Sequence, residues 1–225
     1  EIQDGRIKGT FDQFEIASNL LSTRLGKVKI QNGILFTKNK TNEGYIFHPK
    51  VLRRNNIQIQ NFNLGTFANV KEFGELNGAF MLEGAFNSNY DLTLSSIMGE
   101  ISDVEYLDYK YSDIQINSGS FKNQIFDGHL KIKDDNLHLT YEGFIDLRAD
   151  KHMKFTIDVN KADLENMHLT PRNCLLLANA EFDFHGNNFN NLDGIVKFNE
   201  LQIETQGEVL EVDRLTLKID RAPDA

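Results

Sequence analysis

The chain has one cysteine, three prolines and no tryptophan among its 225 residues. Because Cys174 has no second cysteine to pair with, neither an internal disulfide nor a zinc cluster of paired cysteines can form. No base lies next to Cys174, so we expect it to be a small core residue rather than a nucleophile. The scarcity of proline leaves long stretches free to pair as β-strands.

Long apolar runs and an excess of positive charge are also missing. The uninterrupted apolar stretches fall far short of the ~20 residues that a membrane-spanning helix needs. Asp and Glu outnumber Lys and Arg by 33 to 24, which gives a net charge of -9. This balance argues against nucleic-acid binding and against electrostatic docking on an anionic membrane. The opening residues 1–7 already read as a strand and a turn, so we interpret the chain as a fragment of a longer protein.

What the chain does have is an alternation of apolar and polar residues at a period of two. The clearest run is 137–147, in which Leu137, Leu139, Tyr141, Ile145 and Leu147 share one side. Period two indicates β-strands, because successive side chains point to opposite faces of a pleated backbone. The sequence therefore predicts an all-β fold whose strands each have one apolar face.

Helix signals are few. Residues 16–25 fit an amphipathic helix or a strand equally well, whereas Leu64, Phe67, Val70 and Phe73 predict a short helical turn. Residues 163–167 could form another. Asp134, Asp135 and Asn136 predict a turn between two strands. Other turn-type residues, some of which suit tight hairpins and some bulges, stand at Asn32-Gly33, Asn77-Gly78, Asp127-Gly128, Gly186-Asn187-Asn188 and Asp193-Gly194.

A weak internal repeat of about 100 residues relates 64–117 to 164–219. Phe80-Met81-Leu82-Glu83-Gly84 matches Phe182-Asp183-Phe184-His185-Gly186, and Ser112–Ile116 matches Asp213–Leu217. A repeating β unit without a change in composition favours a solenoid or one continuous sheet. We see no linker and treat residues 1–225 as a single domain.

The residues do not favour an enzyme. Six histidines are scattered without a His-x-His or His-Glu-x-x-His motif, and His138 alternates with Leu137 and Leu139 on the polar side of a strand. The sequence predicts no catalytic residues, no metal site and no cofactor. A β-solenoid polysaccharide lyase or glycosidase is the enzyme alternative; it needs clustered acids and aromatic sugar platforms, which the absence of tryptophan disfavours.

Several segments of the sequence resemble those of a known protein family. These segments are Phe121–Leu139, Tyr141–Leu147, Ala162–Leu169 and Asn187–Gly194. Together with the surrounding pattern, they resemble the TamB proteins of Bacteroidetes. TamB is the translocation and assembly module subunit of the AsmA-like superfamily. The resemblance runs from about residue 64 to 219 and rests on strands and turns, not on catalytic residues. Asp135 stands where the family has a proline, a departure confined to a turn.

The resemblance implies a long twisted β-sheet folded into a U-shaped trough (a β-taco, similar to a β-solenoid groove) with few helical turns. It also implies a periplasmic protein whose full length is anchored in the inner membrane by an N-terminal segment outside this fragment. Such a protein would conduct phospholipid to the outer membrane and support outer-membrane biogenesis, with a TamA-like, Omp85-type barrel as partner. A scaffold or chaperone for outer-membrane proteins is the alternative role.

The expected lipid groove consists of the apolar residues that share one strand face. They are Phe80, Leu82, Leu92, Leu94, Ile114, Ile116, Phe126, Leu130, Ile132, Leu137, Leu139, Tyr141, Ile145, Leu147, Phe155, Ile157, Val159, Phe182, Phe184, Val196, Phe198, Leu201, Ile203, Leu215, Leu217 and Ile219. Pattern alone favours a filled β-sandwich or a filled solenoid for the same residues, since two sheets packed face to face would also bury them. The family resemblance favours the open trough, with phospholipid acyl chains as ligand.

Overall fold

The computed structural model of the chain describes residues 2–220 apart from 42–43, 69–70, 88, 90, 147, 149–151 and 187–192. The described residues are almost entirely β-strand, which confirms the all-β prediction. The elements are β1 (Ile2–Gly9), β2 (Gln13–Ser22), β3 (Lys27–Thr41), β4 (Gly44–Asn63), α1 (Leu64–Ala68), β5 (Phe73–Phe86), β6 (Leu92–Tyr106), β7 (Tyr109–Lys122), β8 (Ile125–Lys133), β9 (Leu137–Asp146), β10 (His152–Asp163), β11 (Leu175–His185), β12 (Asp193–Thr205), β13 (Glu208–Val212) and β14 (Leu215–Ile219).

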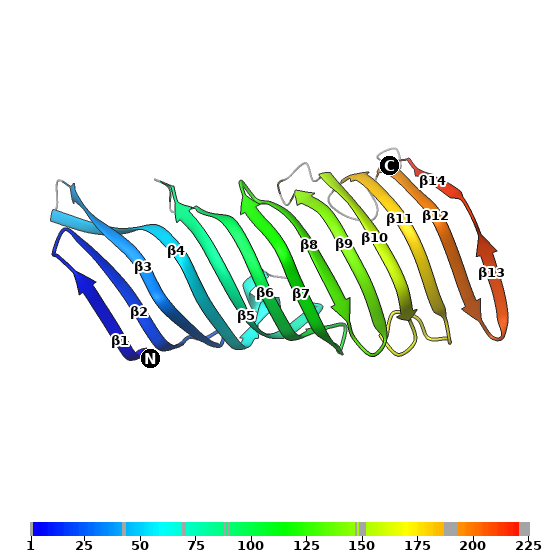
Figure 1. Ribbon diagram of the computed structural model, residues 1–225, viewed down its shortest axis with the longest axis horizontal. Coiled ribbons are helices and arrows are strands. Elements are labelled where there is room, and N and C mark those ends of the chain that lie inside the picture. The colour runs from blue at the N-terminus through cyan, green and yellow to red at the C-terminus, as the bar shows by residue number, and fades with distance from the viewer. Residues whose placement is uncertain are drawn as a thin grey trace.

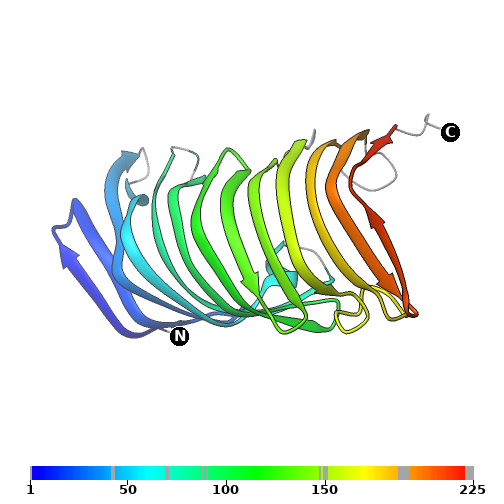
Figure 2. The same cartoon turned by 45° about the vertical axis from the view of Figure 1, so that its right-hand side comes forward.

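All the strands belong to one antiparallel sheet. Each strand from β1 to β13 pairs with its neighbour in sequence, and β14 pairs with β12 beside β13. The strands follow one another along the long axis and bow along their length, so the sheet forms a twisted trough with β1 near one end and β14 near the other (Figures 1 and 2). The described residues do not divide into two packed sheets, so the filled sandwich is wrong for this part of the chain.

The alternating sequence gives this sheet two unlike faces. We call the side that carries Leu139, Tyr141 and their cross-strand partners the apolar face, and the other side the polar face. Side chains on the apolar face are mostly buried or half-buried, whereas polar-face residues such as His138, Lys154 and Asp158 are exposed. The apolar face is therefore the more closely packed of the two faces.

Two of the expected hairpin signals lie inside strands instead. Asn32-Gly33 falls within β3, where the register with β4 shifts between Ile30 and Leu35 and Gly33 has φ 81°. The fully buried Asn55 of β4 holds this bulge: Asn55 Oδ1 accepts from the Asn32 N–H at 3.0 Å, and Asn55 Nδ2 donates to the Gly33 carbonyl at 2.8 Å. Asn77-Gly78 likewise lies within β5, at another register shift. These Asn-Gly pairs therefore bend long strands, because a bulge needs the same permissive backbone as a turn.

The remaining local predictions have mixed outcomes. Residues 16–22 belong to strand β2, and the predicted helical turn at Leu64 is confirmed as α1, although Phe73 already starts β5 and Val70 lies outside the described residues. Residues 163–167 form a turn rather than a helix, closed by a bond from Met167 N to Asp163 O of 3.1 Å.

The turn signals further along the chain also have different outcomes. The turn at Asp134–Asn136 is confirmed between β8 and β9. Gly128 lies inside β8 without a bulge of its own; the register shift is on the neighbouring β7, between Ile116 and Ser118. Gly186 follows β11 and Asp193-Gly194 opens β12, whereas Asn187 and Asn188 lie outside the described residues.

The two halves of the predicted repeat differ in their elements: residues 64–117 contain α1, β5, β6 and most of β7, whereas residues 164–219 contain β11, β12, β13 and β14. Phe80 and Phe182 lie on β5 and β11, each of which is followed by a long antiparallel partner. Strand β7 has a positive φ of 47° at Asp113, and the matching residues Asp213 and Arg214 separate β13 from β14. Strand β7 is continuous through Asp113, whereas β13 and β14 are separate strands, so the repeat stays a prediction from the sequence.

Candidate functional site

The strand register places the expected groove residues on the same face of the sheet. Direct cross-strand partners point to the same side, and the pairing can be followed strand by strand from β3 to β14. One such row consists of Ile30, Ile57, Phe80, Gly99, Ile116, Leu130, Tyr141, Ile157, Ala180, Phe198 and Leu215. A neighbouring row consists of Val28, Ile59, Gly78, Ile101, Ile114, Ile132, Leu139, Val159, Ala178, Leu201 and Val212. The apolar face is therefore continuous along the trough.

Every described candidate lies on this face, although the burial of the candidates differs. Leu147 lies outside the described residues. Ile114, Tyr141, Val159, Phe184, Val196 and Leu201 are buried, Leu217 and Ile219 are 43% and 37% exposed, and the others are half-buried. In a filled core most of these large side chains would be fully buried. Their partial exposure indicates apolar surface that the described part of the chain leaves open.

The connection between β10 and β11 packs on the apolar face along one edge of the trough, beside the turn between β6 and β7. Met167 in this connection is 1% exposed and packs into a cluster with Tyr111, Val159 and Ala178. The next residue, His168, places Nδ1 3.3 Å from the Leu107 carbonyl oxygen in the turn between β6 and β7. The connection thus packs on the apolar face through Met167 and reaches the turn between β6 and β7 through His168. Cys174, half-buried just before β11, belongs to this connection.

Below this connection, the turn at Asp134 is held by a buried polar network. Asp134 is 2% exposed, and its carboxylate accepts hydrogen bonds from the Tyr109 hydroxyl, from Ser112 N at 2.9 Å and from Ser112 Oγ at 2.7 Å. Burial alone would raise the pKa of Asp134, but these bonds and one from Asn136 N lower it below its usual range. Burial, assisted by Asp134, raises the pKa of Tyr109 to about 12. A satisfied carboxylate of this kind fixes a turn and has no free oxygen for catalysis.

Aromatic rings form a short ladder across the middle of the apolar face. The Phe155 and Phe182 rings stack with centroids 4.7 Å apart, and the Tyr141 ring lies 5.3 Å from that of Phe155. Tyr141 Oη is buried and has no hydrogen-bond partner among the described residues. Burial raises the pKa of Tyr141 to about 12, so this hydroxyl remains neutral at physiological pH.

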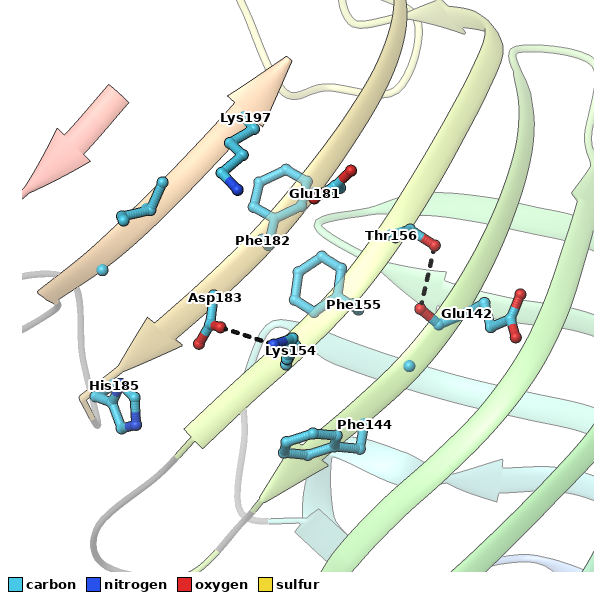
Figure 3. A pocket seen from close by; sticks show the side chains of 13 residues that line it. Glu142, Phe144, Lys154, Phe155, Thr156, Glu181, Phe182, Asp183, His185 and Lys197 are labelled. Carbon is cyan, nitrogen blue, oxygen red and sulfur yellow. Dashed lines mark hydrogen bonds and ion pairs between the residues drawn. The ribbon is translucent and has the colours of Figure 1, made fainter. Parts of the chain in front are cut away.

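The polar face has a hollow of about 780 Å³ over β9 to β12. Its side chains include Glu142, Lys154, Thr156, Glu181, Asp183 and Lys197, with Phe144 and His185 at the rim (Figure 3). Lys154 Nζ lies 3.2 Å from Asp183 Oδ2. The pKa of Asp183 is lowered, chiefly by its hydrogen bond with His152 and then by Lys154, in spite of partial burial. The hollow therefore lies over polar-face residues of both charge signs, and Phe155 and Phe182 of the expected groove also line it (Figure 3).

Sequence reasoning missed one cluster at the rim of this hollow. His152, Asp183 and His185 have ligand-type atoms that all lie within 4.8 Å of one another. The spacing Asp183-x-His185 places two of them on one face of β11, but His152 joins them only through the pairing of β10 with β11. A linear motif search cannot find such a group, because the third residue is 31 positions away from Asp183.

Among the described residues, no helix is long and apolar enough to cross a membrane. A scan against protein-family models, a search of the curated proteins and a search of the solved structures each found no match to this chain.

Proposed function

We propose that the apolar face is a groove that binds phospholipid acyl chains. The observation that carries this proposal is a continuous apolar surface from β3 to β14, about 50 Å long at ~4.8 Å per strand, that no second sheet covers in the described residues. Uncovered apolar area on this scale usually marks a binding surface. The curve of the sheet surrounds an extended chain better than it would a globular partner.

Energetics support an acyl chain as the ligand. Each methylene that leaves water contributes about 0.8 kcal/mol, so a chain of about 16 carbons gains on the order of 10 kcal/mol before the cost of ordering it. Because the lining is uniformly apolar, neighbouring positions along the trough have similar free energies. A bound chain can then slide from strand to strand without escaping from a deep well. The headgroup would remain in water at the open side.

In the cell, we propose the role that the TamB resemblance implies: a non-enzymatic protein of the periplasm that conducts phospholipid between the inner and outer membranes. The full-length protein would be anchored in the inner membrane and would meet an Omp85-type barrel at the outer membrane through parts outside this fragment. The elongated sheet and its repeated strand pattern support this role. The net charge of -9 fits a polar face that does not adhere to anionic headgroups.

The proposal can be tested with the purified chain and a phospholipid whose acyl chain carries a light-activated diazirine. After irradiation in detergent-free buffer, peptide mapping should place the adducts on β8 to β12 at apolar-face residues such as Leu130, Ile157 and Phe182. Adducts confined to polar-face residues such as Lys131 and Asp158, or no adducts above those of a denatured control, would contradict it. Repeating the assay with an unfolded outer-membrane protein as competitor separates lipid binding from the scaffold alternative, in which the protein displaces the lipid.

A further inference from the structure

We propose that His152, Asp183 and His185 form a binding site for a divalent first-row transition-metal ion. Zn²⁺ is the ion used in the test described below. The site is independent of the lipid groove, because its three side chains project from the polar face. His152 is the first residue of β10 and His185 the last of β11, and the two are direct cross-strand partners. Asp183 lies two residues before His185 and therefore on the same face.

The three side chains are already in contact with one another. His152 Nε2 lies 2.8 Å from Asp183 Oδ1, and an ion between them would replace the proton that they share. The two imidazole rings stack with centroids 4.1 Å apart and planes 10° from parallel. The cross-strand pairing of His152 with His185 thus brings two imidazole side chains to one corner of the sheet, beside Asp183.

The side chains must rotate to close around an ion. Zn–N and Zn–O bonds of about 2.0–2.2 Å place tetrahedral ligand atoms about 3.3 Å apart. The three ligand-type atoms lie within 4.8 Å of one another, so the widest separation must shorten by up to about 1.5 Å, and the two rings must rotate out of their stack so that each nitrogen lone pair points at the ion. Two histidines and one carboxylate leave the fourth position to water, and the choice of nitrogen and oxygen ligands suits zinc, copper or nickel better than magnesium or calcium.

Neighbouring side chains support the histidines and limit the affinity. The Asp193 carboxylate lies 4.0 Å from His185 Nδ1, where it can orient the ring, as carboxylates commonly do behind metal-binding histidines. The Phe144 ring meets His152 edge to face, with centroids 5.0 Å apart. Lys154 opposes metal binding, because its ammonium group neutralises Asp183. We therefore expect micromolar rather than nanomolar affinity, and we expect removal of the Lys154 charge to increase it.

The test is calorimetric titration of ZnCl₂ into the metal-free chain, prepared without a polyhistidine tag. We expect one ion per chain, a loss of affinity of at least tenfold in both His152→Ala and His185→Ala, and no change in His129→Ala, which removes a polar-face histidine remote from the cluster. Lys154→Gln should bind about threefold or more tightly. This gain cannot come from misfolding, so it complements the losses.

Three results would overturn the proposal. The first is no stoichiometric binding below millimolar zinc. The second is binding that the His152 and His185 substitutions leave intact, which would assign the ion to other histidines. The third is a Lys154→Gln variant that binds zinc more weakly than the parent chain while its circular dichroism spectrum is unchanged.

Discussion

Gly143 lies directly opposite Phe155 across β9 and β10, on the apolar face. A methyl group on Gly143 would come within 2.3 Å of the Lys154 carbonyl oxygen and 2.5 Å of Phe155 Cα, and Gly143 has a φ of 146°. The two strands can therefore pair in this register only if this position has no side chain. The Phe155 ring takes the space above the glycine and reaches the stacked partner Phe182.

Replacing this glycine should break the pairing locally. We expect Gly143→Ala to lower the free energy of unfolding by more than about 2 kcal/mol, because backbone rather than a flexible side chain blocks the new methyl group. Gly119→Ala is the matched control: Gly119 lies in the same row of the sheet, yet its methyl group would meet only ordinary contacts of 3.4 Å. Urea denaturation of both variants measures the difference, and equal stabilities would contradict the register described above.

Removing the hydroxyl of Tyr141 should not harm the fold. Its Oη is buried without a hydrogen-bond partner among the described residues, so the folded state bears a desolvation cost that phenylalanine does not have. We expect Tyr141→Phe to raise the free energy of unfolding by about 1 kcal/mol, as measured by chemical denaturation in lipid-free buffer. A clear loss of stability would mean that the hydroxyl has a partner that the structure does not contain.

The Asp134 network makes stability depend on acid. Since the pKa of Asp134 is lowered in the folded state, its contribution is fully present above the ordinary value of 3.8 and is lost as the pH falls through the lower folded value. Asp134→Asn keeps the shape but turns one acceptor into a donor that faces Ser112 N, so we expect a loss of about 1–3 kcal/mol at pH 7. Urea midpoints for the two proteins should converge as the pH is lowered toward 2, and parallel curves would argue against this assignment.

Met167 should be the main anchor of the connection that packs on the apolar face. It is 1% exposed, whereas Leu169, two residues further on, is 44% exposed. We expect Met167→Ala to cost about 2–4 kcal/mol and Leu169→Ala less than about 1 kcal/mol, because only the first leaves a cavity. Thermal unfolding of the two variants compares them directly; similar melting temperatures would show that the connection is not anchored here.

The sequence predicts the strands well where alternation is regular. From β8 to β12 each inward residue identified by parity lies on the apolar face, because a single buried face fixes parity in a strand. Long strands with bulges are harder. Asn32-Gly33 reads as a hairpin turn, yet Asn55, more than twenty residues later, satisfies the backbone of a bulge at that position. The sequence around Asn32 does not contain Asn55, so the bulge cannot be predicted from it.

The two candidate sites also differ in how far the local sequence predicts them. The apolar face could be predicted from strand parity alone, since it repeats in every strand. The histidine cluster could not, because the stacking of His152 on His185 depends on which residues of β10 and β11 face each other. That register is set by the whole β10–β11 pair and by the length of the connection between the strands, including the turn at Met167.

The most direct test of the central claim is site-specific photo-crosslinking in cells. A light-activated residue is placed at Leu139, on the apolar face of β9, and in a second strain at the adjacent His138, which is exposed on the polar face. Binding of acyl chains in the trough predicts phospholipid adducts at Leu139 and none at His138. No lipid at either position, in protein that is folded and present at normal levels, would contradict the groove and favour a scaffold whose apolar face is covered by protein.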